Sequence, residues 1–545
     1  MAYGQCLNYP FVYDDLSGIV ENPVISQAET IGQAFRALLA QWRPVTHASY
    51  ALTHAVFGFS QPAFHATNVI IHILNTLLVF GIGIRLATRW VPEINPGHFA
   101  FVAATIHAVH PLYTEAVTYI SGRSSSLCAL FYFGCLYLVM CAVESRETTW
   151  RSLWFSMAAV SGILAWASKE EAITLPIIVA VFLMLSGYRK PAIVLIVVPA
   201  ALLIARWQAI TVLYRTSATN QSLVDVGVGT PVQTLPYVLS AIKAAVFYYM
   251  GHFAIPLAQS VDPYFRTVQS IVEPGFLIAF GVLASLVAIA VYFSTKQPVV
   301  TFAIAALLIS PLLAYAVIPL ADIVAEHRIY IAGLGFELLA AWLLTRVPRL
   351  MWPSVAALAI TLTASTIAHN SVWASEVRLW QQAERNSQNQ VRPHLNLGVA
   401  YQVAGQFDEA LEEYRHALAL RPDLPLVYSN MGAIYLAEAR LDDAEAVLKR
   451  ALELYPSIPQ AYINLASISL NRKQPKEALE YAAKAESVGA AGYWVHFVRA
   501  QALELLQQLD AARAEYEIAA MLSEGRGPIH TEIQNRLSKL QAPRQ

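Results

Sequence analysis

The sequence predicts an all-α protein in two parts, a polytopic bundle of transmembrane helices followed by a solenoid of helical repeats. The chain of 545 residues is 56% hydrophobic and only 13% charged, whereas a soluble globular protein carries about 25% charged residues. Of its 73 Asp, Glu, Lys and Arg residues, 34 lie in 1–370 and 39 in the much shorter 371–545. A repeated pattern also begins in the second part. We therefore place a domain boundary near residue 370.

Apolar stretches recur through the first part. A membrane-spanning helix needs about 20 mostly apolar residues, and about 17 can suffice. On this basis we predict about ten spans, near 64–84, 98–111, 125–143, 152–168, 172–187, 191–206, 275–294, 299–318, 328–345 and 351–368. Residues 31–59 mix Arg36, Trp42, Arg43 and His47 with apolar positions and are predicted to lie on the membrane surface. We expect no cleavable signal peptide, because the first residues lack a basic stretch and an apolar core.

The segment 232–256 determines the predicted topology. It is long enough to cross the membrane, but Pro236, Lys243, His252 and Pro256 interrupt it. If it does not cross and Asp14 lies outside, the loop cations satisfy the positive-inside rule; these are Arg85, Arg89, Arg146, Arg151, Arg189, Lys190, Lys296, Arg346 and Arg349. We therefore predict a re-entrant or surface helix there. The same topology places residues 10–62 and the repeats on the periplasmic side of a bacterial inner membrane.

Two adjacent carboxylates, Asp14 and Asp15, precede the first predicted span in the stretch FVYDDLSGIV. Adjacent acids repel each other and are poorly placed for burial near a bilayer, so the pair indicates catalysis or cation binding. A solvated turn is the alternative interpretation, because Asp and Ser favour turns.

Further polar residues gather in connections that the topology places on the same side. They are Arg43; His110, Glu115 and Arg123 in HPLYTEAVTYISGR; Lys169, Glu170 and Glu171 in SKEEAITLP; and Glu326, His327 and Arg328 in AEHRIYIAGLGF. Singly, such charges are as well explained by anchoring and salt bridges. Together they predict a site for an anionic, lipid-linked substrate whose phosphate is held by Arg and Lys. His65, Asn68 and His72 share one helix face and are interpreted as satisfied interior residues rather than a metal site.

The second part contains an internal repeat of 34 residues, with copies near 396–429, 430–463 and 464–497. Registered positions include Gly398 with Gly432 and Pro422 with Pro456. Small residues let paired helices approach and proline ends the second helix, so this is the tetratricopeptide pattern. A degenerate copy is predicted at 498–531, and VWASEVRLWQQAERN upstream is interpreted as a partial repeat or cap. Such solenoids bind peptides in a concave groove, and we expect acceptor contacts from Asn396, Asn430 and Asn464.

Composition argues against two classes of function. The net charge of −1 disfavours a nucleic-acid partner. Three of the four cysteines, Cys128, Cys135 and Cys141, lie in one apolar segment and are interpreted as small packing residues. Because Cys6 stands alone, no disulfide framework or zinc spacing is expected.

With both parts considered, the chain resembles the transmembrane and tetratricopeptide-repeat O-mannosyltransferases and their bacterial relatives, which have the class C glycosyltransferase fold. The resemblance rests on FVYDDLSGIVENP, WRPVTHASYAL, FHATNVIIHILN, HPLYTEAVTYISGR, SKEEAIT and AEHRIYIAGLGF, followed by the repeats. It implies an inverting transfer of a sugar, usually mannose, from a polyprenyl phosphate to Ser or Thr of an acceptor protein presented by the repeats. The family has a membrane helix before the acidic loop, whereas only residues 1–10 precede it here.

The resemblance also implies roles for individual residues. Asp14 would be the general base, while Asp15 would raise the pKa of Asp14, orient the site or bind a divalent cation. Arg123, Lys169 and Arg328 would hold the donor phosphate, and the remaining site candidates are Arg43, His110, Glu115, Glu170, Glu326 and His327. No complete metal-ligand set is visible, so we expect no metal and no other cofactor. A non-enzymatic membrane scaffold for envelope or pilus assembly is the alternative function, whereas a transporter is disfavoured because the polar residues gather at one face.

Overall fold

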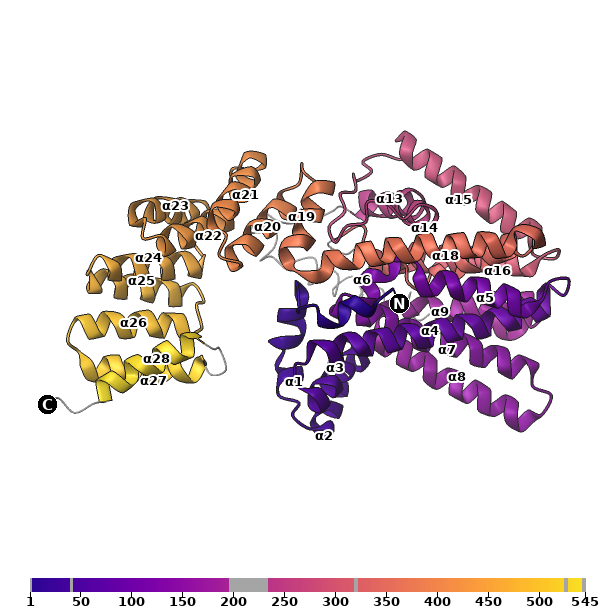
Figure 1. The fold of residues 1–545 in the computed structure, drawn as a ribbon, viewed down its shortest axis with the longest axis horizontal. Helices are drawn as coiled ribbons and strands as arrows, with labels where there is room; N and C mark the ends of the chain where they lie inside the picture. The colour runs from indigo at the N-terminus through magenta and orange to yellow at the C-terminus, as the bar shows by residue number, and fades with distance from the viewer. Residues whose placement is uncertain (1, 40–42, 196–233, 318–321, 524–527, 542–545) are drawn as a thin grey trace. The chain divides into compact units, whose positions relative to one another are not determined.

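The computed structural model describes residues 2–39, 43–195, 234–317, 322–523 and 528–541, and every regular element in these ranges is a helix (Figure 1). The chain divides into two compact units. The first, which we call the membrane unit, takes in the described residues up to Ser387, and the second, the repeat unit, those from Gln388 onward. The predicted all-α fold class, with membrane-spanning helices followed by helical repeats, is confirmed.

The membrane unit consists of helices that range from single turns to 30 residues. They are α1 (Pro23–Ser26), α2 (Ile31–Ala34), α3 (Pro44–Phe57), α4 (Gln61–Trp90), α5 (Pro96–Val109), α6 (Thr114–Val117), α7 (Arg123–Glu144), α8 (Thr148–Ser168), α9 (Leu175–Leu185), α13 (Thr234–Ala244), α14 (Gly251–Ala254), α15 (Pro274–Phe293), α16 (Pro298–Val317), α17 (Gly333–Leu344), α18 (Pro348–Asn370) and α19 (Glu376–Asn386).

Four helical segments of the described chain are long and apolar enough to cross a membrane, namely Gln61–Trp90, Ile120–Glu144, Pro274–Phe293 and Pro348–Ala374. The chain is therefore an integral membrane protein. Helices α5, α8, α9, α16 and α17 lie where further spans are expected, and their lengths run from 11 to 21 residues. The predicted span 191–206 falls largely outside the described residues, so the number of ten spans stays a prediction.

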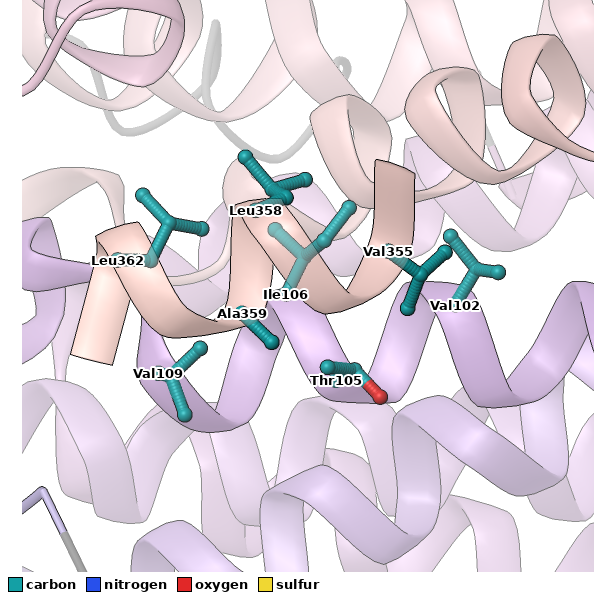
Figure 2. Close-up of a pocket in the computed structure, with 8 residues that line it drawn as sticks. All are labelled: Val102, Thr105, Ile106, Val109, Val355, Leu358, Ala359 and Leu362. Carbon is teal, nitrogen blue, oxygen red and sulfur yellow. The ribbon is translucent and has the colours of Figure 1, made fainter. Parts of the chain in front are cut away.

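The core of the membrane unit is apolar and closely packed around α4, α5, α7, α16 and α17. The seam between α5 and α18 illustrates this (Figure 2), because its lining leaves no room for a water molecule: Val102, Thr105, Ile106, Val109, Val355, Leu358, Ala359 and Leu362. All four cysteines are buried free thiols, which agrees with the packing role predicted for Cys128, Cys135 and Cys141.

The two segments with an ambiguous relation to the membrane are both helical. The described residues of 31–59 include α2, the 3₁₀ turn η3 (Phe35–Leu39) and α3. Several large apolar side chains there are exposed, namely Ile31, Phe35, Leu38, Leu52, Val56 and Phe57. The segment 232–256 becomes α13, a π-helical turn η7 (Ala245–Met250) and α14. It is not among the four described segments that meet the length and hydropathy of a span. Its re-entrant placement stays a prediction.

The repeat unit contains four antiparallel helix pairs and a final helix. They are α20 (Val391–Val403) with α21 (Phe407–Leu420), α22 (Pro425–Ala437) with α23 (Leu441–Leu454), α24 (Pro459–Asn471) with α25 (Pro475–Ser487), α26 (Tyr493–Leu505) with α27 (Leu509–Leu522), and α28 (Pro528–Gln541). The turn inside each pair has one left-handed residue at the same register: Gly405, Ala439, Lys473 and Gln507. The degenerate fourth copy therefore folds like the others.

Glycine is required where the paired helices of the first repeat meet. A Cβ atom on Gly398 of α20 would lie 2.5 Å from Cε1 of Tyr414 on α21, closer than carbon atoms approach. The tyrosine is fully buried, and its hydroxyl donates to Gln402 Oε1 at 2.7 Å. The registered glycines predicted from the period thus have the packing role expected of them.

Helix α19 packs differently from the prediction. The sequence VWASEVRLWQQAERN was interpreted as a partial repeat or cap, but its described residues cluster with the membrane unit, so the unit extends to Ser387 rather than to 370. The reason is its apolar face, since Leu379 packs with Val12, Tyr119 and Trp373, and the ring of Trp380 contacts that of Tyr13. The density of charged residues therefore increases near 370, before the division between the compact units after Ser387.

Candidate functional site

The two adjacent acids lie in different environments. Asp14 is exposed, whereas Asp15 is only 1% exposed at the start of the π-helical turn η2 (Leu16–Val20). The chain reverses at Tyr13, whose φ of 54° is in the left-handed region that a tyrosine rarely adopts. Its backbone N–H donates to Glu376 Oε1 at 2.9 Å. Such strain persists where surrounding structure enforces it, and it is frequent at functional sites.

Asp15 is anchored to a turn more than a hundred residues away. Its Oδ1 accepts from the backbone N–H of Ser121 at 2.8 Å and from the Ser121 hydroxyl at 2.6 Å, and its Oδ2 accepts from Val12 N–H at 3.2 Å. Ser121 belongs to the 3₁₀ turn η5 (Ile120–Gly122) that precedes α7. Gly122 is needed there, because a Cβ atom would collide with the carbonyl oxygen of Glu115. Sequence reasoning missed Ser121, since nothing in the pattern pairs it with Asp15.

Arg123 is fully buried at the first position of α7. Its guanidinium donates at 2.6 to 3.1 Å to four neutral acceptors, namely Asn68 Oδ1, the Ser49 carbonyl, Thr53 Oγ1 and the Phe64 carbonyl. The ring of Tyr50 lies 4.5 Å from its central carbon. Because these groups come from α3 and α4, Arg123 joins three helices next to the acid loop. Its donors are directed inward, which suits a positioning residue better than a phosphate ligand.

A second group of charges lies where α3 meets the end of α8. Arg43 holds Glu170 through both carboxylate oxygens, at 3.0 Å and 2.6 Å. Lys169 is buried and its ammonium contacts Glu171 Oε1 at 2.6 Å and the hydroxyl of Ser125 at 2.7 Å. These residues are brought together because the 3₁₀ turn η6 (Glu170–Thr174) follows α8 directly. Arg43 with Glu170 and Lys169 with Glu171 form ion pairs, in agreement with the alternative interpretation that such charges serve as salt bridges.

The third group joins α6 to the 3₁₀ turn η8 (Glu326–Ile329). Glu115 accepts from the backbone N–H of His327 and contacts its Nδ1, both at 2.8 Å. Burial alone would raise the pKa of Glu115, but the nearby His327 and Arg328 hold it below its ordinary value. Lys169 is close enough to disfavour the charged form of His327. The second and third groups of charges are therefore electrostatic neighbours.

The other two candidates are buried connectors. Glu326 is 1% exposed and accepts from three donors, namely the Tyr248 hydroxyl, Gln259 Nε2 and the Ser260 N–H. His110 bridges two backbone groups, because its Nδ1 accepts from Leu112 N–H and its Nε2 meets the Phe253 carbonyl. Both residues tie the outer connections to the segment around 248–260. The contacts of Glu326 and His110 therefore indicate a structural role for both side chains.

His65, Asn68 and His72 lie inside the bundle and each makes a hydrogen bond there, as predicted. His65 meets the Tyr9 carbonyl, Asn68 donates to backbone carbonyls near 117–120, and His72 Nδ1 lies 2.5 Å from the Tyr330 hydroxyl. Sequence reasoning missed the network beyond them, in which His107 Nδ1 and the Tyr113 hydroxyl both contact Glu337 Oε1. The sequence signal that could have revealed this network was Glu337, the acidic residue in the otherwise apolar helix α17.

The environment of Asp15 makes its protonation sensitive to pH. Burial raises the pKa of Asp15 from 3.8 to about 7, and the charge of Asp14 adds to this, while the Ser121 and Val12 hydrogen bonds oppose it. The sequence-based suggestion that Asp15 raises the pKa of Asp14 stays a prediction. In the unfolded chain Asp15 ionises near its ordinary value, so folding favours its protonated form.

This shift predicts how stability depends on pH. The contribution of Asp15 is fully present below pH 3.8 and is lost as the pH rises through about 7, at up to about 1.4 kcal/mol per pH unit. Relative to Asp15→Asn, the wild type should therefore lose thermal stability between pH 5 and about 7 and level off above that. Melting in detergent across this range measures it, with Glu21→Gln, at an exposed acid of the same loop, as the control whose profile should run parallel to the wild type. If the stability of Asp15→Asn depended on pH in the same way as that of the wild type, the raised pKa of Asp15 would be contradicted.

The sequence is similar to several curated proteins that share one name, protein O-mannosyl-transferase. A protein O-mannosyl-transferase of Caenorhabditis elegans, F38B6.6, is 26% identical over 445 residues, covering 77% of this chain and 61% of that protein. Mouse TMTC3 is 22% identical over 481 residues, covering 77% and 50%. Mouse TMTC1 is 31% identical over 192 residues, covering 32% and 20%.

The chain is a distant relative of the TMTC protein O-mannosyltransferases.

This relationship confirms the resemblance read from the sequence motifs. A tetratricopeptide-repeat family model matches residues 389–457, which confirms the repeats. The chain spans about 61% and 50% of the length of the first two TMTC proteins it matches. Among solved structures, PilF of Pseudomonas aeruginosa is 27% identical over 30% of this chain and 73% of its own, with a TM-score of 0.26. TTC0263 of Thermus thermophilus is 17% identical over 33% and 94%, with a TM-score of 0.27.

The three predicted acceptor-binding asparagines occupy equivalent places on the first helix of each repeat. Asn396 on α20 and Asn430 on α22 are half-buried, whereas Asn464 on α24 is buried. Asn464 Oδ1 accepts from Gln460 at 3.3 Å, and its Nδ2 has no hydrogen-bond partner. A buried amide without a partner is costly. Acceptor binding by this row stays a prediction.

Proposed function

We propose that the chain is a membrane protein O-glycosyltransferase that moves a sugar, mannose by analogy with its relatives, from a polyprenyl phosphate to a Ser or Thr hydroxyl of an acceptor polypeptide. The observation that carries the proposal is the pair of acids, in which an exposed carboxylate, Asp14, stands on a loop held rigid by its buried neighbour, Asp15. A catalytic group needs both access to substrate and a fixed position.

In the proposed reaction Asp14 accepts the proton of the acceptor hydroxyl as that oxygen attacks C1 of the sugar. The new bond forms between the acceptor oxygen and C1, while the bond from C1 to the phosphate oxygen breaks. Polyprenyl phosphate leaves with the bonding electron pair, and the configuration at C1 inverts. A hydroxyl needs a base because it is a weak nucleophile until its proton is taken up during attack.

Asp15 acts in this proposal as a positioning residue. Both of its oxygens already accept hydrogen bonds, from Ser121 and from Val12. This leaves the carboxylate poorly disposed to bind a divalent cation, the other role considered for it. By fixing the loop between Tyr13 and η2, it holds Asp14 towards the solvent side.

Lys169 and Arg328 are the proposed ligands of the donor phosphate. Arg328 donates to the Asp322 carbonyl at 2.6 Å and lies near Glu115, and Lys169 lies near His327. Positive charge at this place would stabilise the negative charge that develops on the departing phosphate. Arg123 is moved from this set to a positioning role, because its hydrogen bonds are directed to neutral groups of the protein.

An apolar cavity of about 460 Å³ among α13, α15 and α16 supports a lipid-linked donor. The side chains that line it are all hydrocarbon: Ile242, Phe280, Leu283, Ala284, Val287 and Leu312. Such a surface suits part of an isoprenoid chain, which gains by leaving water and has no polar group to satisfy.

The proposed phosphate ligands make a testable prediction. Arg328→Ala and Lys169→Met should each weaken binding of a short-chain polyprenyl phosphate by about 10- to 100-fold, since a hydrogen bond to a charged group contributes about 1.5–3 kcal/mol. Fluorescence-based binding in detergent measures the affinity. Arg346→Ala is the matched control, because Arg346 pairs with Glu93 at a loop predicted to face the cytoplasm. Unchanged affinity in both test variants would place the phosphate elsewhere.

The function itself is tested by intact-mass analysis of envelope proteins from cells with and without the gene. Loss of a hexose-sized mass from a secreted protein supports the proposal and identifies the acceptor. Unaltered masses, together with an assembly defect, support the alternative of a non-enzymatic repeat scaffold. The two hypotheses also differ on Asp14, which only the enzyme requires.

A further inference from the structure

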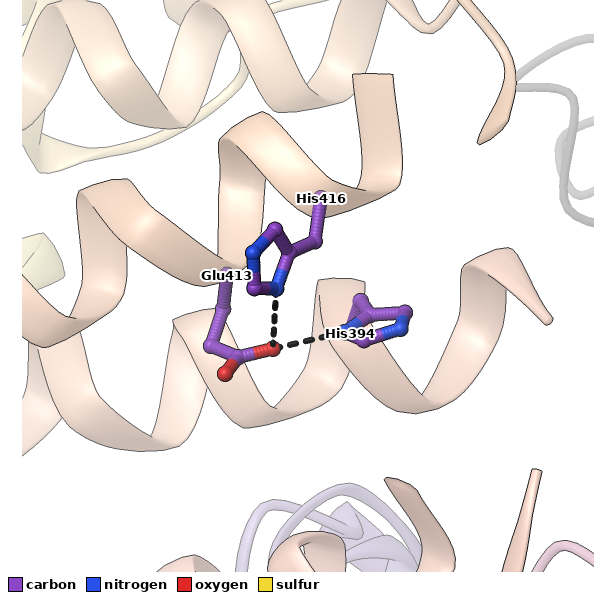
Figure 3. Close-up of side chains that lie close together, drawn as sticks. All are labelled: His394, Glu413 and His416. Carbon is purple, nitrogen blue, oxygen red and sulfur yellow. Dashed lines mark hydrogen bonds and ion pairs between the residues drawn. The ribbon is translucent and has the colours of Figure 1, made fainter. Parts of the chain in front are cut away.

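A cluster of metal-ligating side chains lies in the first repeat, outside the site described above. His394 lies on α20, and Glu413 and His416 lie one turn apart on α21 (Figure 3). One carboxylate oxygen, Glu413 Oε2, lies 2.7 Å from His394 Nδ1 and 4.0 Å from His416 Nδ1. The three potential ligand atoms are all within 4.8 Å of one another. We propose that His394, Glu413 and His416 form a zinc site that joins the two helices of the first repeat.

The distances fit a small rearrangement around an ion. Ligand atoms about 2.0–2.2 Å from a tetrahedral Zn²⁺ are separated from one another by about 3.4 Å. One observed separation, 2.7 Å, is shorter than this, and the other, 4.0 Å, is longer. Both separations differ from the required one by less than 1 Å, so we expect zinc binding to need only adjustments of these side chains.

The surroundings of His394 resemble those of a metal ligand. Its Nε2 lies 2.9 Å from the backbone carbonyl of Gln388, which orients the ring with Nδ1 towards Glu413. Metal-binding histidines commonly donate their second ring N–H to a carbonyl or carboxylate in this way, because it fixes the tautomer. The exposures grade outward, with side-chain values of 6%, 16% and 53% for His394, Glu413 and His416. An ion there would keep a coordination position open to solvent.

The ligand set selects the metal. Two imidazoles and one carboxylate suit borderline ions such as Zn²⁺ and disfavour Mg²⁺ and Ca²⁺, which prefer oxygen ligands. No metal is expected from the sequence, because no complete ligand set is visible along the chain, whereas the helix hairpin brings together His394 and Glu413, which are 19 residues apart. The available signal was Glu413 and His416, three residues apart on one helix face.

The fourth repeat provides an internal control. His496 and Glu515 occupy the positions equivalent to His394 and Glu413, three periods of 34 residues later, and their Nδ1 and Oε2 atoms are 2.6 Å apart. The third position is Ile518, which is exposed and cannot ligate a metal. The His–Glu contact alone is therefore a hydrogen bond between helices that the fold uses twice. The additional His416 is what distinguishes the first repeat.

The test uses the full-length protein in detergent, stripped with a chelator and titrated with Zn²⁺ alone against a colorimetric zinc indicator. The wild type should bind one ion per chain at this site, and His416→Ala should weaken it on the order of a hundredfold or more. His496→Ala should leave the affinity unchanged, and Ile518→His should add a second ion. Because His416 and Ile518 are exposed, both variants should melt like the metal-free wild type, which separates lost binding from lost folding.

Two outcomes would overturn the proposal. One is a wild type that binds no more zinc than His416→Ala, and the other is equal weakening by His496→Ala and His416→Ala. Glu413→Gln supplies a second check, because the amide keeps the shape of the side chain but is a poor zinc ligand. Zinc binding that Glu413→Gln leaves intact would also count against the site.

Discussion

Replacing Asp14 by Asn is expected to lower sugar transfer by about 10²–10⁴-fold, the usual contribution of a general base. The amide keeps the shape of the side chain but cannot accept the proton of the acceptor hydroxyl. Because Asp14 is exposed, the variant should fold and bind donor like the wild type. The assay is transfer of labelled sugar from polyprenyl phosphate in detergent, with melting measured beside it.

The matched control is Glu21→Gln, which removes an exposed acid from the same loop and should leave transfer unchanged. Asp15→Asn should reduce transfer only in part, since its proposed role is to hold the loop through Ser121. If well-folded Asp14→Asn protein turned over at the normal rate, Asp14 would be a residue of a solvated turn and the enzyme hypothesis would lose its base.

Replacing Arg123 by Met is expected to give the largest loss of stability. The change leaves buried acceptors of two helices, α3 and α4, without a donor, including Asn68, Thr53 and the Phe64 carbonyl. Unsatisfied buried groups of this kind make the expected loss about 3–5 kcal/mol in the free energy of unfolding. Arg123→Lys should not rescue it, because one ammonium cannot reach acceptors spread around a planar guanidinium.

Chemical unfolding in detergent measures this effect, and Arg146→Met, at an exposed arginine of the same apolar hairpin, is the control that should change little. Donor binding distinguishes the two roles considered for Arg123. A variant of normal stability that had lost affinity for polyprenyl phosphate would return Arg123 to the phosphate site and refute its positioning role.

Local patterns in the sequence were sufficient for the fold class and for the placement of most helices. Hydropathy marks membrane spans because the bilayer interior excludes unpaired polar groups, and a 34-residue period marks repeats because each helix pair must bury the same face. The motifs around Asp14, Glu115, Lys169 and Arg328 also identified the relationship to the TMTC proteins. Each of these signals lies within one stretch of chain.

Only the tertiary structure decided which residues in those motifs are buried and which partners they contact. Nothing local distinguishes Asp14 from Asp15, and it is the fold that buries Asp15 and brings Ser121 to it as a hydrogen-bond donor. Arg123 is buried and hydrogen-bonded between helices because its acceptors come from α3 and α4, far from it in the sequence. Likewise α19 joined the membrane unit through Leu379. Burial and pairing depend on residues far apart in the chain, so these assignments required the folded molecule.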